Sequence, residues 1–378
     1  MIDTMKLTLD KNMFWIKDID RFQKERQNAT RGYFTLVQNP TKSELKSGIY
    51  KPRLTITKRF NVSGRFEQTL SIELSLPKLL YGNNFDELQD SDLSLIVDKL
   101  REVLKEMGVR VFKTILKSAP ISTVHYSKNV PLTNGLTPHF LIGKIKEANI
   151  PLSLDINQTD YRNDGHSYKW HSNSYEVAFY DKIKDLEMAV KSDKRAIEKD
   201  NSPQLHLFQE LRMRKKEVLR MEVRLNNRQK MKQLFNNLKL QNEFTLEGLF
   251  KTEIAKCILL HYLDELENQR PKMLDYISKN PKSLLAEIIV SNPNLGTLKT
   301  IQAFGLKLAL DALTPRELRA MFGKYHKRSW YRLFAEAKTV QLPSIKNPFE
   351  VMRKNLIDFV PLKLVDYNTK MINNDKYN

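Results

Sequence analysis

The sequence contains a single cysteine, Cys257. It therefore offers no intramolecular disulfide and no zinc site built from cysteines, which is the usage expected in a reducing cytoplasm. It also has no uninterrupted apolar run of about 18 residues, so we expect no membrane-spanning helix. Residues 1–16 lack a cationic segment followed by a continuous apolar one, which argues against a secretory signal.

Several sequence motifs of common enzyme classes are also missing. The chain has no GxxxxGKS phosphate-binding loop, which argues against an ATP-driven motor. It has no HExxH motif and no GxSxG motif. No dinucleotide-binding fingerprint occurs among the 12 glycines, and the seven histidines never form a His-x-His pair.

Positive charge, in contrast, is abundant. Lys and Arg number 63 against 44 Asp and Glu, which gives a formal charge of +19, and 41% of the 378 residues are hydrophobic. That length and composition allow a sizeable core and two or three domains. The charge makes a polyanion the expected partner, either nucleic acid or an anionic membrane. Surface binding to a membrane needs a basic amphipathic helix with an exposed apolar face, whereas the best helices here look core-facing.

The first 80 residues are predicted to form strands. Residues 5–9, 52–58 and 66–76 alternate between apolar and polar side chains. Turn-forming residues at 61–64 separate the last two runs, which predicts a hairpin. Glu73 is a carboxylate on the polar face of the last strand.

Helices and strands then mix up to about residue 230. We predict helices over 91–107, 138–148 and from 181 toward 199. We predict strands over 109–118, 121–127, 152–156 and 219–225, and a hairpin of two strands with a short polar turn over 167–180. Most strand links look antiparallel, so the fold class is α+β, with a mainly antiparallel N-terminal sheet and flanking helices.

The segment around Tyr180 carries the clearest chemical pattern. A strand gives way to a helix there, and Lys184 lies four residues further on, so the two side chains share a helix face. A nearby cation favours the phenolate form of a tyrosine. A tyrosine that attacks a phosphodiester also needs a Lys or a metal to offset the charge on the phosphate. The alternative is an ordinary interfacial tyrosine beside a solvated lysine.

Three predicted strands each carry one potential metal ligand on the less apolar face, namely Glu73, His125 and Glu222. If these strands are neighbours, two carboxylates and an imidazole converge. Such a set suits Mg²⁺ or Mn²⁺ better than zinc. Taken singly, each residue also fits an ordinary hydrogen-bonding or solvated role.

Basic side chains surround the strand over 219–225. Arg220 and Arg224 alternate with its apolar residues, and further cations flank it, among them Lys215 and Arg228. This density suits contacts with DNA phosphates. A solvated surface is the alternative for any single member.

After about residue 235 the pattern is helical, with predicted helices over 245–267, 283–290 and 298–313. Thr314, Pro315 and Glu317 form a capping signal for a further helix. Basic and aromatic residues, including Arg328, interleave over 316–338. That segment fits a helix-turn-helix DNA reader and equally a helical cap with a wet basic face. We therefore predict two domains, 1–234 and 235–378.

Five segments resemble the replication initiators of filamentous phages, the gene II protein family, and related phage and plasmid replication proteins. They are the opening Met1-Ile2-Asp3, SIELSLPKLLYGNN at 71–84, ISTVHYSKN at 121–129, EVAFYDKIKDLE at 176–187 and LRMEVRLNNR at 219–228. The likeness covers roughly residues 1–230, with a weaker similarity over 308–337.

The resemblance implies a nick-and-join endonuclease that initiates rolling-circle replication. Such proteins nick one strand of double-stranded DNA at an origin, and the nucleophilic tyrosine, which carries over to Tyr180, becomes linked to the 5′-phosphate. The freed 3′-OH primes synthesis, and rejoining circularises the displaced strand. Lys182 or Lys184 would offset charge near the attacking phenol. Host replication proteins and a bacterial cytoplasm are the implied partners and location.

Two points stay open at this stage. The broader superfamily binds its divalent metal through a His-hydrophobic-His pair, which this sequence lacks, so no ligand set carries over. The competing function is a non-catalytic, sequence-specific DNA-binding protein, either a regulator or a degenerate initiator, and the charge of +19 suits it equally well.

Overall fold

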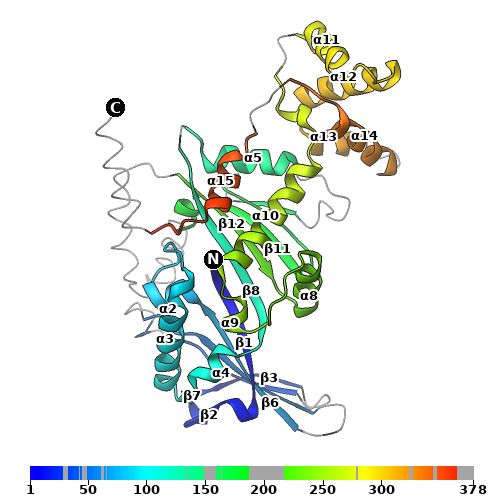
Figure 1. Ribbon diagram of the computed structural model, residues 1–378. Coiled ribbons are helices and arrows are strands. Elements are labelled where there is room, and N and C mark those ends of the chain that lie inside the picture. Colours follow the sequence, from blue (N-terminus) through cyan, green and yellow to red (C-terminus); the bar gives the residue numbers. More distant parts are fainter. Residues whose placement is uncertain are drawn as a thin grey trace, which may run out of the picture.

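A ten-stranded antiparallel sheet forms the centre of the molecule (Figure 1). The computed structural model describes residues 1–28, 33–41, 43–44, 49–60, 64, 66–133, 135–148, 159–162, 164–186, 217–277, 280–322, 327–343 and 347–363. The strand order is β3-β4-β5-β6-β1-β8-β12-β11-β10-β9. These strands are β1 (Ile2–Asp10), β3 (Gln23–Asn28), β4 (Tyr33–Gln38), β5 (Arg53–Phe60), β6 (Phe66–Ser75), β8 (Ile121–Pro131), β9 (Thr159–Arg162), β10 (Ser167–His171), β11 (Tyr175–Asp181) and β12 (Val218–Leu225).

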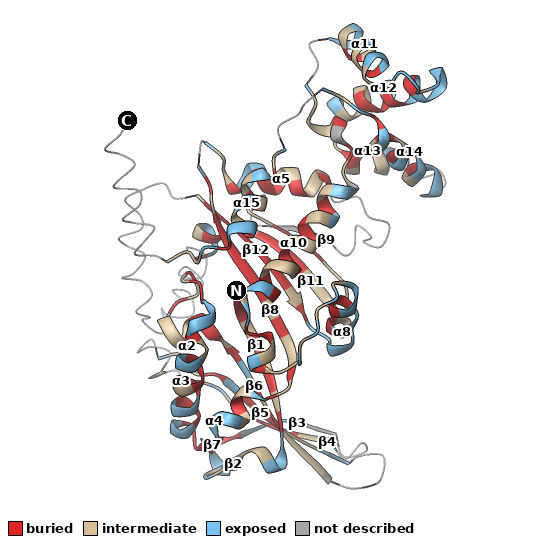
Figure 2. Cartoon of the chain, in the orientation of Figure 1, coloured by how far each residue is buried: buried red, intermediate tan, exposed pale blue. Residues whose placement is uncertain are grey.

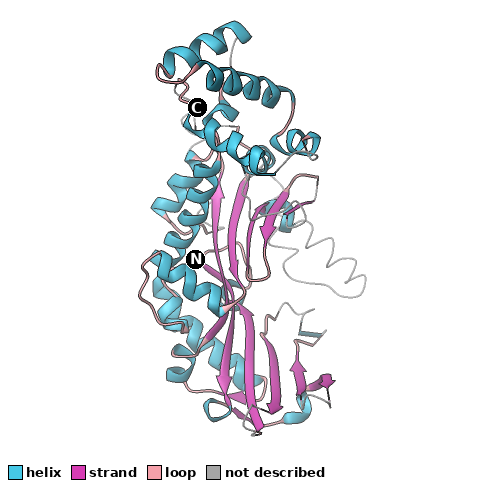
Figure 3. Ribbon diagram, turned by 90° about the vertical axis from the view of Figure 1, so that its right-hand side faces the viewer, coloured by secondary structure: helices cyan, strands magenta, loops and turns pink. Residues whose placement is uncertain are grey.

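Helices gather on one side of this sheet (Figure 3). They are α2 (Leu76–Tyr81), α3 (Leu93–Glu106), α4 (Lys113–Lys117), α5 (Pro138–Ala148), α8 (Arg228–Asn237), α9 (Leu246–Leu249), α10 (Thr252–Gln269) and α15 (Glu350–Asp358). The strands have period two, so one set of side chains, such as Leu70 and Ile72, enters the shared core. Buried residues concentrate along the central strands (Figure 2).

A second, smaller core holds the helical lobe, which comprises η7 (Lys272–Asp275), α11 (Pro281–Ser291), α12 (Thr297–Ala312), α13 (Pro315–Met321) and α14 (Lys327–Thr339). Figure 1 shows this lobe beyond one end of the sheet. Leu284, Leu306 and Phe334 lie in its interior. The predicted cap at Thr314 is confirmed, because its hydroxyl accepts from the backbone N–H of Glu317 and the Glu317 carboxylate accepts from that of Thr314.

The two cores divide the chain differently from the predicted boundary at residue 234. Helices α8, α9, α10 and α15 contribute to the core of the sheet, although they follow that boundary or adjoin it. The lobe has a core of its own. The α+β class with a large antiparallel sheet is confirmed.

The prediction of one strand over 109–118 was wrong. The chain forms β7 (Val109–Arg110), which pairs with β2 (Trp15–Ile16) in a two-stranded ribbon, and then α4. Val109 and Val111 are buried with the two-residue period of a strand, whereas Leu116 is buried as part of a helix. The strand period and the helix period thus occur in one short segment. The predicted strand over 152–156 and the predicted helix beyond 186 lie outside the described residues. No helix in the described ranges is both long and apolar enough to cross a membrane.

Candidate functional site

Three neighbouring strands place polar side chains in rows on the face of the sheet opposite its apolar core. In the order β11, β12, β8 the first row is Tyr180, Arg220 and Asn129. The next two rows are Ala178, Glu222 and Ser127, and then Glu176, Arg224 and His125. The alternation predicted from the sequence therefore brings Tyr180, Glu222 and His125 to one face, as the strand period requires.

Tyr180 contacts Glu222 directly. Its hydroxyl donates a hydrogen bond of 2.8 Å to Oε2 of Glu222. The residue opposite Glu222 on β11 is Ala178, whose small side chain leaves room for this diagonal contact. Tyr180 is half-buried and lines a cavity of about 830 Å³.

Glu222 is buried among cations. Its Oε1 accepts from Nε of Arg224 at 2.9 Å and lies 3.5 Å from Nδ1 of His125, while Oε2 lies 4.0 Å from Nε of Arg220. Burial alone would raise the pKa of Glu222, but the hydrogen bond from His125 and the charges of Arg224 and Arg220 bring it well below its usual range. Glu222 is thus a carboxylate that stays ionised.

Tyr180 itself is a protonated phenol. Burial raises its pKa well above 10, the charge of Arg220 opposes this rise, and the charge of Glu222 adds to it. The sequence-based idea that Lys184 favours a phenolate was therefore wrong for the free protein. Asp181 ends β11, and its carboxylate accepts from the backbone N–H groups of Ile183 and Lys184 at the start of a helical turn over 182–186.

Lys182 is the cation next to the ring. Its Nζ lies 5.8 Å from the centroid of Tyr180 and 3.4 Å from Oδ2 of Asp185, and its side chain has no exposed surface. Burial, with a further contribution from the charge of Arg220, lowers the pKa of Lys182 from 10.5 to about 8.

A second group of titratable residues lines the same cavity. Nδ1 of His166 lies 3.3 Å from Oδ2 of Asp181, and Nε2 of His166 contacts Nζ of Lys184. Sequence reasoning missed His166. The hairpin could have revealed it, because the turn at 172–174 sets the pairing of Ser167 with Tyr180. His166 therefore lies beside Asp181, and the backbone N–H of Asp181 donates to the carbonyl of His166.

Glu73 does not join this group. Strand β1 separates β6 from β8, and Glu73 is exposed, with Lys6 and Arg53 as its cross-strand neighbours. The premise that the three ligand-bearing strands are neighbours was thus wrong for β6. Within the part of the chain that the structure describes, no three His, Cys, Asp or Glu side chains form a group able to hold a metal ion.

The predicted DNA contacts also separate. Arg220 is only 2% exposed and donates to the carbonyl of Asn84 and the hydroxyl of Ser127, so it cannot reach DNA in this structure. Arg224 is half-exposed and lines the cavity. Arg228 and Arg328 are exposed at the starts of α8 and α14, away from the cavity lining. Lys215 lies outside the described residues.

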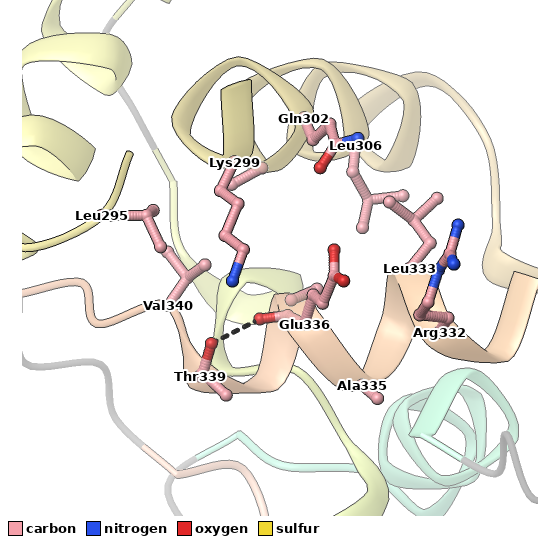
Figure 4. A pocket seen from close by; sticks show the side chains of 12 residues that line it. Leu295, Lys299, Gln302, Leu306, Arg332, Leu333, Ala335, Glu336, Thr339 and Val340 are labelled. Carbon is pink, nitrogen blue, oxygen red and sulfur yellow. Dashed lines mark hydrogen bonds between the residues drawn. The ribbon is translucent and has the colours of Figure 1, made fainter. Parts of the chain in front are cut away.

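The helical lobe has a smaller cavity of about 260 Å³ between α12 and α14. Figure 4 shows Lys299 and Glu336 directed into it from opposite helices. Its other lining residues are largely apolar, with Arg332 at the rim. No phenol or imidazole is among its described lining residues, whereas the Tyr180 cavity has both.

Comparisons with known proteins place few constraints on the chain. No family model and no curated protein matches it. Among solved structures, it is similar to the rolling circle replication initiator protein from Geobacillus stearothermophilus, with 10% sequence identity and a TM-score of 0.30 over 69% of this chain and 83% of that one. A TM-score this low does not define a common fold, so the function has to be argued from the side chains.

Proposed function

We propose that the protein cleaves and rejoins one strand of DNA through a covalent link to Tyr180. The observation that carries the proposal is the 2.8 Å hydrogen bond from the Tyr180 hydroxyl to a buried, ionised Glu222 at the wall of an 830 Å³ cavity. A cavity of that size suits a nucleotide-sized ligand. The sequence resemblance adds the biological setting, which is the initiation of rolling-circle replication at an origin.

In the first step, the Tyr180 oxygen attacks the phosphorus in line. The new bond joins that oxygen to the phosphorus, and the phenolic proton passes to Oε2 of Glu222, which already accepts it. Because the pKa of Tyr180 is raised and that of Glu222 is lowered, the proton moves only as the bond forms. The free protein therefore holds an unreactive phenol.

The leaving 3′-oxygen needs a proton as its bond to phosphorus breaks. The Lys184 ammonium is the donor that we assign, with His166 and Asp181 as the residues that position it. The product is a 3′-OH and a 5′-phosphotyrosyl link. The joining step is the reverse, with a 3′-OH as the nucleophile, and it returns the proton to Tyr180.

The charge of the cavity bears on the predicted Mg²⁺ or Mn²⁺. Six carboxylates but only three Lys or Arg side chains line it, so a DNA phosphate entering alone meets net repulsion. Glu222 and Glu176 are, however, already paired with Arg224, and His125 with Glu222. These residues do not form a ready metal site, and the steps above use no metal. The cation stays a prediction.

Covalent capture tests the proposal. The protein is incubated with a randomised pool of single-stranded oligonucleotides labelled at the 3′ end, in the presence of Mg²⁺ or Mn²⁺, and resolved under denaturing conditions. The label must be 3′, since the retained fragment carries the 5′-phosphate. We expect a labelled adduct whose modified peptide contains Tyr180, and no adduct with Tyr180→Phe.

Tyr175→Phe is the matched control, because Tyr175 lies on the same strand, is also half-buried, and points to the opposite face. That variant should form the adduct normally. An adduct on the Tyr180→Phe protein would remove the assignment of the nucleophile. DNA binding without any adduct would favour the non-catalytic DNA-binding function instead.

A further inference from the structure

A second surface combines exposed aromatic rings with cations. It lies at the β2–β7 ribbon, at the lower end of Figure 1, whereas the helical lobe lies at the upper end. A cavity of about 520 Å³ opens there. Its lining includes Phe14, Trp15, Arg101, Lys105, Arg110 and Phe112, which we call the aromatic platform.

The ribbon itself explains why these rings face outward. Trp15 pairs with Arg110, and Val109 and Val111 on either side of Arg110 are buried. Strand alternation therefore turns Trp15, Arg110 and Phe112 away from the core. Trp15 is 64% exposed and Phe112 is 73% exposed, and the Arg110 guanidinium lies 5.4 Å from the centroid of the Trp15 ring. Exposure of two large aromatic rings beside one cavity is unusual for side chains with so much apolar area.

The cations of the platform lack the partners that neighbouring cations have. Arg101 and Lys105 are exposed and four residues apart on α3, so they share a helix face. Among the described residues, neither they nor Arg110 forms an ion pair, and no carboxylate lines this cavity. Lys113, close by in the sequence, is paired with Asp98. The charge of the platform is thus uncompensated and positive.

We propose that the aromatic platform binds single-stranded DNA, with bases stacked on Trp15 and Phe112 and phosphates held by Arg101 and Lys105. Aromatic rings stack on any of the four bases, and cations without protein partners can bind the phosphates of the DNA backbone. The surface therefore suits binding of a single strand without sequence preference. The site is separate from the Tyr180 cavity, with which it shares no lining residue. The inference rests on the proposed function only in taking DNA as the partner.

Tryptophan fluorescence gives a direct readout. The chain has three tryptophans, and the other two, Trp170 and Trp330, are 4% and 7% exposed, so quenching by a bound base reports on Trp15. The full-length Tyr180→Phe protein, which cannot be consumed by reaction, is titrated with a short oligothymidylate at fixed salt. We expect the emission to fall, and Phe112→Ala to weaken the binding by roughly ten- to a hundred-fold, since one stacked base is lost.

Two controls separate stacking from charge. Phe140→Ala removes an exposed aromatic side chain from α5 and should leave the affinity unchanged. An abasic oligonucleotide of the same length keeps the phosphates, so it should bind more weakly and leave the emission of Trp15 unchanged. Equal binding of the abasic strand, or equal affinity of Phe112→Ala, would overturn the platform and leave only a basic surface or a protein-binding patch.

The proposed function and the platform fail independently. Trp15→Ala with Tyr180 intact should still form the covalent adduct at saturating oligonucleotide, with the apparent affinity reduced. A normal adduct with no loss of affinity would reject the platform alone. Quenching in the Tyr180→Phe protein without any adduct in the native chain would reject the nuclease alone.

Discussion

Replacing Arg220 by Gln separates the structural account of this residue from the sequence-based one. The guanidinium donates to the Asn84 carbonyl and to the Ser127 hydroxyl, each at 2.8 Å, and lies 3.1 Å from the Asp3 carboxylate. Hydrogen bonds from a charged donor contribute about 1.5–3 kcal/mol each. Loss of one member of a buried ion pair costs about 3–5 kcal/mol, because the partner stays buried without compensation.

We expect the free energy of unfolding of Arg220→Gln to fall by about 3–5 kcal/mol. The loss should stay below the sum of the individual hydrogen-bond contributions, because Glu222 keeps its hydrogen bond from Arg224 and the glutamine side chain can donate to one of the vacated acceptors. Urea unfolding followed by circular dichroism measures the change. For a denaturant slope near 3 kcal/mol/M, the midpoint should drop by roughly 1 M or more.

The control is Arg228→Gln, which removes an exposed cation next to the N-cap of α8. It should change the stability by less than about 0.5 kcal/mol. The structural role of Arg220 is contradicted if Arg220→Gln is as stable as the native protein while the slope of log K for DNA binding against log salt concentration falls by about one. That result would mean that the guanidinium contacts a phosphate.

Three further predictions concern the proposed chemistry and the buried lysine. Lys184→Met should cleave DNA about 10²- to 10⁴-fold more slowly. A substrate with sulfur in place of the leaving 3′-oxygen should restore the rate of this variant, because a thiolate leaves without a proton. If the sulfur substrate is cleaved no faster by the variant, Lys184 is not the proton donor. The pKa of Lys182 is lowered to about 8, so between that pH and 10.5 the unfolded chain binds more protons and the free energy of unfolding rises with pH. Lys182→Met should abolish this rise and increase the free energy of unfolding at pH 7 by up to about 3 kcal/mol, as measured by urea unfolding at several pH values. If the variant and the native protein show the same pH dependence, the ammonium is not buried. Chelation with EDTA should stop adduct formation if a divalent cation screens the carboxylates of the cavity, and unaffected nicking would discard the metal.

Strand phase predicted which side chains of each strand lie on the same side of that strand. Tyr180, Glu222 and His125 follow from a period of two, and the structure brings all three to one cavity. The order of the strands was not predictable, because β1 pairs with both β6 and β8 across long stretches of sequence. Because β1 lies between β6 and β8, Glu73 is separated from His125 and Glu222.

Residue type gave a wrong prediction at Arg220 for a related reason. Nearly every residue of β12 is buried, because this strand lies between two others and is covered on its apolar face. Arg220 pairs with protein groups and is buried, whereas Arg224 pairs with Glu222 and Glu176 and stays partly exposed. Sequence alternation alone does not distinguish these two environments.

The link between the helical lobe and the sheet has a mechanical consequence. Arg316 of α13 donates to the hydroxyl of Tyr168 and lies over its ring. Tyr168 pairs with Phe179, the residue before Tyr180. The contact therefore ties the lobe to β10, the strand that pairs with the Tyr180 strand β11, so a displacement of the lobe has to break this hydrogen bond or carry β10 with it.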